Sequence, residues 1–302
     1  MRDIEKILQS PSDNFSGFSS NFDESSFVVF GFPFDATSTY RRGSKAGPRE
    51  IRKASLNIET YSFRTNTYIE DFKICDLGDI KLTASLPNTL GRIAAVVSRA
   101  VKEKKIPILL GGEHTATFGV VDGLPPDTAI VSFDAHFDLR QKYLGKRLSH
   151  TTFMRRIAEN IGPQKLCFVG TRAICKDEME YVRRSKVKFL PARHLLYEGW
   201  HKAAKEIRDF AQSFRNIYVT LDMDVIDPSE APGVGNPEAE GLGSVLLLDI
   251  LQGVVDERLI GFDLVEVAPR YDFGVTSILA ARIAFEMIGF KESSQTIKRV
   301  VR

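Results

Sequence analysis

Residues 129–138 read Ala-Ile-Val-Ser-Phe-Asp-Ala-His-Phe-Asp, so an apolar run passes directly into three polar residues at alternate positions. The apolar half is typical of a strand buried on both faces of a parallel sheet. In an extended chain alternate side chains share one side, so Asp134, His136 and Asp138 converge while the residues between them turn away. Two carboxylates about 4 Å apart repel by roughly 4 kcal/mol at an effective dielectric constant near 20. The stretch therefore predicts a metal ion at the end of a sheet strand.

Short apolar runs and longer amphipathic stretches alternate along the whole chain. Asn88–Lys104, for example, carries apolar residues at three- and four-residue spacing, with Arg and Lys on its other face. This alternation predicts a doubly wound α/β sandwich. Because no repeat or linker divides the sequence, we expect one domain over residues 1–302. The expected strands are Phe27–Phe32, Phe72–Cys75, Ile106–Leu110, Ala129–Phe133, Leu166–Gly170, Val187–Leu190, Ile217–Leu221 and Ile260–Val267. The other expected helices lie at Arg49–Ala54 after Pro48, around Tyr181, and at Ala203–Phe214, Val245–Val255 and Ser277–Phe290.

Two long irregular segments, Asp35–Ala46 and Asp227–Gly243, interrupt this alternation. Structureless stretches of this length in a compact domain are usually functional loops. In open parallel sheets such loops gather at the carboxyl ends of the strands, where ligands bind. We therefore expect both segments to border the functional site.

Two further polar clusters follow expected strands. His114 comes after a pair of glycines, and Asp222 and Asp224 share one face of a second cluster, with Asp227 close behind. Alone, the first is consistent with a hydrogen-bonded histidine in a turn, and the second with a solvated or helix-capping loop. If these two clusters meet residues 134–138 at one edge of a sheet, the three together supply four carboxylates, two imidazoles and no thiolate. The combined set predicts a shared metal site, and we expect Asp227 to lie in the same pocket.

This donor set favours hard or borderline divalent ions such as Mn²⁺ over structural zinc. Six ligands are too many for one ion that keeps an open position, but they suit two ions about 3.5–4 Å apart that share carboxylates. Such a pair lowers the pKa of a bridging water, so hydrolysis is the expected reaction. A two-metal phosphoesterase and a non-catalytic, metal-stabilised binding protein are the competing classes.

Two residues outside the ligand set are candidates for substrate chemistry. Glu266 ends an apolar strand, where it is either a salt-bridged structural residue or an acceptor for a planar cation such as a guanidinium. His150 is either a surface histidine or a proton shuttle to a leaving amine. His194 and His201 flank Trp200 without companion ligands, and we expect them to be surface or packing residues.

The composition excludes some classes of binding partner and indicates the cellular compartment. The 302 residues carry a formal charge of +2, which gives no electrostatic attraction for nucleic acid or an anionic membrane. No apolar run reaches the roughly 18–20 residues that span a bilayer, and the first residues do not read as a secretory signal. Cys75, Cys167 and Cys175 are odd in number and far apart, which predicts free thiols, the first two buried, and a cytoplasmic protein.

With these motifs in order, the sequence resembles the ureohydrolase (arginase/agmatinase) family over nearly its whole length. The resemblance runs from Gly31–Asp35 and the loop through Arg42-Gly43-Ser44, past Gly47-Pro48 and Ile51-Arg52, to Glu266–Pro269. It implies a single three-layer α/β/α domain around an eight-stranded, mostly parallel sheet, with two Mn²⁺ per subunit. It also implies a trimer or hexamer.

The resemblance also assigns roles. One ion would be bound by His114, Asp134, Asp138 and Asp222, and the other by Asp134, His136, Asp222 and Asp224. Hydroxide between the ions would attack the guanidinium carbon and release urea and an amine. Glu266 would orient the guanidinium, His150 would shuttle the proton, and Asp138 would also contact the hydroxide.

The stretch Asp138–Tyr143, followed by Ser149-His150, is similar to agmatinases. It implies a small cationic guanidino substrate, agmatine, cleaved to putrescine and urea. Because Arg140, Lys142 and Lys146 could serve a carboxylate, arginine, guanidinobutyrate and formiminoglutamate stay open as alternatives. Three positions depart from the family pattern: Glu113 stands where Asp is commoner, Asn236 where Thr is usual, and Glu240 where Gly is typical. The last two are expected near the substrate.

Overall fold

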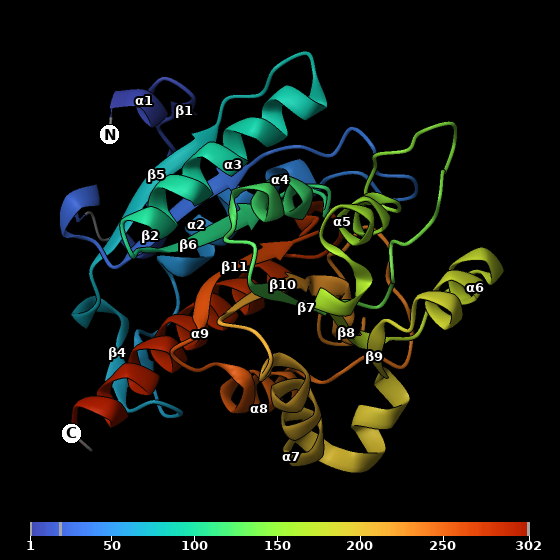
Figure 1. Ribbon diagram of the computed structural model, residues 1–302. Helices are drawn as coiled ribbons and strands as arrows, with labels where there is room; N and C mark the ends of the chain where they lie inside the picture. Colours follow the sequence, from blue (N-terminus) through green and yellow to red (C-terminus); the bar gives the residue numbers. More distant parts are fainter. Residues whose placement is uncertain (1, 18–19, 301–302) are drawn as a thin grey trace.

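The computed structural model describes residues 2–17 and 20–300, and its centre is a large twisted sheet (Figure 1). The strand order is β1-β5-β2-β6-β11-β10-β7-β8-β9, and every pairing is parallel except that of β1 with β5. The strands are β1 (Leu8–Gln9), β2 (Phe27–Phe32), β5 (Ile74–Ile80), β6 (Ile106–Gly111), β7 (Thr128–Phe133), β8 (Leu166–Thr171), β9 (Lys188–Pro191), β10 (Asn216–Asp222) and β11 (Leu259–Val265). A separate hairpin pairs β3 (Tyr61–Ser62) with β4 (Thr67–Tyr68).

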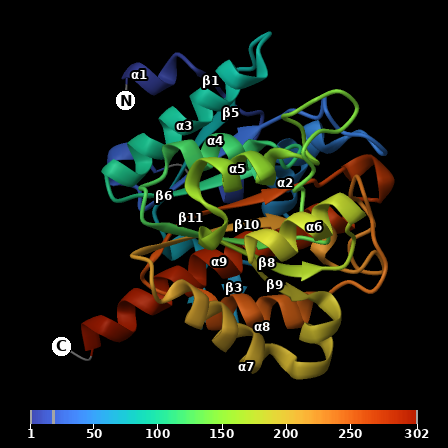
Figure 2. The ribbon, with the colours of Figure 1, turned by 45° about the vertical axis from the view of Figure 1, so that its right-hand side comes forward.

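Helices cover both faces of the sheet, which gives three layers. Figures 1 and 2 show α3, α4 and α5 on one side and α7, α8 and α9 on the other. The buried apolar side chains form two clusters that the sheet separates, and alternate residues of β2 belong to opposite clusters. The helices are α1 (Arg2–Glu5), α2 (Gly47–Ser55), α3 (Leu86–Lys102), α4 (Ala116–Gly123), α5 (Phe153–Ile161), α6 (Lys176–Ser185), α7 (Ala192–Ala211), α8 (Ser244–Val254) and α9 (Val275–Val300).

The α/β prediction is confirmed, and each of the eight expected strands is present. The described part of the sheet has a ninth strand, because the short β1 adds an antiparallel edge. Its two residues are too few to form a recognisable strand pattern in the sequence. Among the helices, α7 begins at Ala192 rather than at the expected Ala203. Among the strands, the largest boundary error concerns β5, which was expected to end at Cys75 but continues to Ile80. Asp76 and Asp79 break the apolar pattern there, since their carboxylates are bound by a buried arginine.

That arginine is Arg52 of α2, whose side chain is only 1% exposed. Its Nε and Nη2 donate to the two carboxylate oxygens of Asp76 at 2.8 and 3.0 Å, and its Nη1 donates to Asp79 at 2.6 Å. Nη2 also reaches the Gly78 carbonyl oxygen at 3.2 Å, and the Phe15 backbone N–H donates to Asp76. The guanidinium therefore joins α2 to an outer strand through a fully hydrogen-bonded, buried ion network.

Of the helices that the structure describes, three were not expected: the short α1, α4 and α5. Of the eight residues of α4, five are buried on several sides, so no one-sided apolar stripe marks the helix in the sequence. Gly119 lies so close to α3 that an added Cβ would come within 2.6 Å of the Leu90 carbonyl oxygen. The glycine thus permits a close contact between two helices while lowering the helical signal.

The remaining expectations concern the cysteines and the membrane. Cys75 and Cys167 are buried, Cys175 is partly exposed, and all three are free thiols, as predicted. Among the helices within residues 2–17 and 20–300, none is both long and apolar enough to cross a bilayer.

Candidate metal centre

The polar clusters meet at the carboxyl ends of four neighbouring strands, β6, β11, β10 and β7. His114 follows β6, Glu266 follows β11, Asp222 ends β10, and Asp134 follows β7. The turn after β6 depends on Gly112, where a Cβ would lie 2.1 Å from the Phe34 carbonyl oxygen. Neighbouring strands are about 4.8 Å apart, so the sheet itself brings these side chains within reach of one another.

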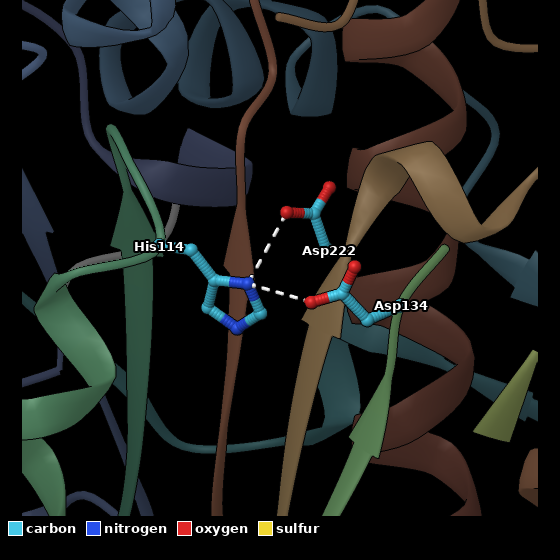
Figure 3. A group of neighbouring side chains, drawn as sticks. All are labelled: His114, Asp134 and Asp222. Atoms are coloured by element: carbon cyan, nitrogen blue, oxygen red, sulfur yellow. Dashed lines mark ion pairs between the residues drawn. The ribbon is translucent and has the colours of Figure 1, made fainter. Parts of the chain in front are cut away.

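His114, Asp134 and Asp222 form the first ligand group (Figure 3). The Nδ1 atom of His114 lies 3.1 Å from Asp134 Oδ2 and 3.2 Å from Asp222 Oδ2. All three residues are buried, and their ligand atoms lie within 4.8 Å of one another. This spacing is what one cation among them requires.

Asp134, His136 and Asp224 form a second group of the same compactness. His136 Nδ1 lies 3.0 Å from Asp224 Oδ2 and 3.6 Å from Asp134 Oδ1. Asp134 belongs to both groups and offers a different oxygen to each, which is the position of a bridging ligand. Ala135 is buried, and the Phe137 ring packs on Phe168, so both residues turn away from the cluster as the alternation predicted.

Asp138 stands slightly outside the first group. Its Oδ2 is 3.8 Å from His114 Nδ1, and its backbone has a left-handed φ of 50° rather than the extended conformation assumed from the sequence. Asp222 uses Oδ1 to accept the Asp224 N–H at 2.8 Å and faces the first group with Oδ2. The structure thus brings the six expected ligands together, while the ligation by Asp138 and the sharing of Asp222 stay predictions.

The hydrogen bonds around His114 fit a metal ligand. Thr220 Oγ1 lies 2.6 Å from Asp263 Oδ1, to which its proton goes, so it accepts at 2.9 Å from the His114 Nε2–H. With Nε2–H donated to Thr220, Nδ1 is the nitrogen of His114 that would coordinate a cation lying among the carboxylates. Both His114 Nδ1 and Asp134 Oδ2 are buried without a hydrogen-bond partner among the described residues. Two buried polar atoms that face each other without a hydrogen-bond partner are expected where a cation belongs.

The charges in the cluster lead to the same conclusion. Burial raises the pKa of Asp222, and the neighbouring Asp224 and Asp134 carboxylates raise it further. Burial and the Asp134 carboxylate likewise raise the pKa of Asp138. These carboxylates are therefore crowded beyond what their imidazole neighbours neutralise, and divalent cations would relieve that repulsion.

Glu266 and His150 lie beside the ligand groups and line the same inner cavity. Glu266 Oε1 accepts the His114 backbone N–H at 2.9 Å and lies 3.9 Å from His150 Nδ1. Burial and the Glu113 carboxylate raise the pKa of Glu266 to about 8. Burial and the neighbouring imidazoles lower the pKa of His150 to about 4, so its ring is neutral near pH 7. Glu266 also has a left-handed φ of 63°, a conformation that costs energy outside glycine and is concentrated at functional sites.

Threonines that the sequence analysis did not single out hold His150 in place. Thr37 Oγ1 accepts the His150 N–H at 3.0 Å, and Thr39 Oγ1 lies 3.0 Å from His150 Nε2. Thr37 in turn donates to Glu113 through its hydroxyl at 2.5 Å and its N–H at 2.7 Å. Glu113, which departs from the family pattern, therefore fixes the position of the loop of residues 35–46 through these hydrogen bonds to Thr37. The only feature of the sequence that could have indicated these threonines is the hydroxyl-rich composition of residues 35–46.

An outer cavity of about 490 Å³ continues from the inner one, because both are lined by His136, Asp138 and Asn236. Thr39 contributes from the first long loop, and Asn236 and Glu238 contribute from the second. Both loops thus border the site, as expected. The substrate-binding role of Asn236 stays a prediction.

Two expectations about the second loop are wrong. Asp227 does not line the metal cavity: its carboxylate accepts hydrogen bonds from Ser229 and from the Gly241 N–H, which holds the loop closed. Glu240 lines a separate surface pocket rather than the inner or outer cavity, and its φ is 62°, which explains why glycine is typical there. His194 pairs with Glu206, and His201 stacks on Trp200, which confirms that neither belongs to the site.

Comparison with known proteins agrees with this geometry. Residues 25–289 match the model of the Arginase family. An agmatinase from Halalkalibacterium halodurans is 37% identical over 278 residues, covering 89% of this chain and 93% of the relative. An N(1)-aminopropylagmatine ureohydrolase from Thermococcus kodakarensis is 35% identical over 267 residues, covering 87% and 90%. The crystal structure of agmatine ureohydrolase of Thermoplasma volcanium matches 98% of this chain and 99% of its own, at 34% identity and a TM-score of 0.88. By sequence, fold and ligand cluster, this chain belongs to the arginase family of ureohydrolases, enzymes that hydrolyse amidino C–N bonds.

Proposed function

We propose that this protein hydrolyses agmatine to putrescine and urea with two bound Mn²⁺ ions. The observation that carries the proposal is the double use of Asp134, whose two oxygens face two overlapping groups of buried ligands. Glu266 and His150 line the cavity that those groups border. A relative from H. halodurans named agmatinase and a solved agmatine ureohydrolase support the choice of substrate.

The donor chemistry supports manganese. The two groups offer carboxylate oxygens and imidazole nitrogens without a thiolate, a set that suits Mn²⁺ and other borderline or hard ions. Bound there, two divalent ions would supply Lewis-acid activation of water at neutral pH.

The chain's own residues would bind and orient the substrate. The Glu266 carboxylate is anchored through Oε1, and Gly235 leaves room beside Oε2, since a Cβ there would come within 3.3 Å of it. A guanidinium could donate paired hydrogen bonds to such a carboxylate, and its positive charge would lower the raised pKa of Glu266 and favour the ionised form near pH 7. His150 is held by Thr37 and Thr39 and is neutral near pH 7, so it can accept a proton and pass it to the departing amine.

The positions of the basic residues favour an amine tail over a carboxylate tail. Arg140 lines the outer cavity, but its guanidinium packs 4.7 Å from the centre of the Tyr143 ring and its Nε lies 3.8 Å from Glu178. Lys142 and Lys146 do not line the cavity. A substrate carboxylate would therefore find no uncommitted cation among these three residues.

Urea release tests the proposal. Purified protein is stripped of metal, loaded with Mn²⁺, and assayed in parallel with agmatine, arginine and 4-guanidinobutyrate. We expect agmatine to give the highest kcat/KM and the stripped protein to be inactive. Urea from none of the three would overturn the proposed function. A preference for arginine would overturn only the choice of substrate.

Glu266→Gln tests the role of the acceptor. Removing the charge weakens a charge-assisted hydrogen bond, so kcat/KM for agmatine should fall by about 10- to 100-fold. Because Glu266 belongs to neither ligand group, metal content measured by mass spectrometry should stay at the wild-type value. A variant with wild-type kcat/KM would show that Glu266 is structural, and one that lost its metal would assign it to the metal site instead.

A further inference from the structure

We propose that Glu238 binds the distal ammonium of the substrate and so selects amine-tailed guanidines. This inference rests on the proposed function and extends it from the reacting guanidinium to the other end of the molecule. Glu238 lines the outer cavity, which continues from the inner cavity where Glu266 lies. A linear substrate held at its guanidinium by Glu266 must place its tail in this outer cavity.

The other charged residues of the outer cavity are already engaged. Arg172 donates to a ring of backbone carbonyl oxygens, including that of Asp224 at 2.6 Å. Glu178 accepts the Leu139 and Cys175 N–H groups at 2.9 and 3.2 Å and faces Arg140. These side chains shape the cavity wall and have little capacity left for a ligand.

Glu238 differs from them. Its carboxylate accepts no hydrogen bond from any residue that the structure describes, and its side chain is 46% exposed. His136 Nε2 lies 3.7 Å from Glu238 Oε1, which is within ion-pair range but beyond hydrogen-bond distance. This carboxylate is thus free to accept a hydrogen bond from a ligand.

The backbone beneath this carboxylate is held firmly. Arg172 Nη2 donates to the Glu238 carbonyl oxygen at 2.9 Å, and its Nε donates to the Ala239 carbonyl oxygen at 2.8 Å. The same guanidinium reaches the Gly170 carbonyl oxygen at the end of β8 at 3.2 Å. Glu238 is therefore presented from a loop tied to the sheet, and little ordering is required when a ligand binds.

A free carboxylate at the tail position discriminates by charge. It attracts an ammonium, is indifferent to a methyl group, and repels a carboxylate. Discrimination of this kind acts on binding of the tail, away from the reacting carbon, so it should change KM more than kcat.

The test compares Glu238→Gln with wild type on three substrates of similar length: agmatine, butylguanidine and 4-guanidinobutyrate. Loss of a charge-assisted hydrogen bond should raise KM for agmatine by about tenfold. KM for butylguanidine should stay unchanged, and KM for 4-guanidinobutyrate should fall. Glu240→Gln is the matched control, because Glu240 lies two residues away on the same loop but lines a separate pocket, and it should leave all three KM values unchanged.

An unchanged KM for agmatine in Glu238→Gln would overturn the proposal. So would an equal loss on all three substrates, since that pattern, together with reduced metal content, would make Glu238 a positioning partner of His136 instead. Failure of the proposed function is seen separately, in the wild-type protein, as the absence of urea from every substrate. That result would remove this proposal as well.

Discussion

Asp134→Ala is expected to abolish urea release, with kcat lowered by about a thousandfold or more. The substitution removes the carboxylate that faces both ligand groups, so neither group stays complete. Metal ions contribute several kcal/mol of transition-state stabilisation, and each 1.4 kcal/mol is a factor of ten in rate. Metal content after dialysis should fall in parallel with activity, because both sites lose a ligand.

Asp209→Ala is the matched control for this variant. Asp209 is an exposed aspartate of α7 whose only ion-pair partner among the described residues is Lys205, so its loss should change neither metal content nor kcat. Circular dichroism would confirm that both variants are folded. Wild-type turnover in Asp134→Ala would show that the ligand cluster has been misassigned, whatever its metal content.

Arg52→Ala should give the largest loss of stability. The substitution leaves the buried Asp76 carboxylate without its cation, and breaking one partner of a buried ion pair typically costs about 3–5 kcal/mol. Denaturant unfolding followed by circular dichroism would measure the loss as a lower midpoint at an unchanged slope. Arg49→Ala, on the exposed side of the same helix, should change the free energy of unfolding by less than about 0.5 kcal/mol.

Arg52→Met combined with Asp76→Asn and Asp79→Asn separates charge from packing. Removing both signs of charge together should recover part of the stability lost in Arg52→Ala, because no unpaired ion stays buried. If Arg52→Ala instead unfolds at the same denaturant concentration as Arg49→Ala, the buried network contributes little to the fold.

Much of the fold could be predicted because buried parallel strands leave near-continuous apolar runs, as β2 and β7 do. Prediction of secondary structure failed where contacts with distant residues determine the structure more than the local pattern of apolar and polar residues does. Asp76 and Asp79 look like a strand terminus until Arg52 of a distant helix is placed beside them. In α4, burial on several sides removes the periodicity on which helix prediction depends.

Most of the candidate site could also be predicted from the sequence. His114, Asp134 and Asp222 follow apolar runs, so the topology of a parallel sheet was sufficient to gather them. Asp227 was misplaced because adjacency in sequence does not reveal that its carboxylate turns back to hold its own loop. Thr37 and Thr39, which hold His150, could not be predicted because no sequence spacing marks residues of this kind. The trimeric or hexameric state and the cytoplasmic location stay predictions.

The ligands come from the ends of three strands that meet only when the sheet is assembled, because β10 pairs with both β7 and β11, and β11 pairs with β6. No continuous piece of this chain therefore carries the binding site by itself. Ions that bind the finished sheet but not the unfolded chain shift the folding equilibrium toward the native state by mass action. Metal supply and conformational stability would thus be thermodynamically linked in this protein, with loaded molecules resisting unfolding and proteolysis better than metal-free ones.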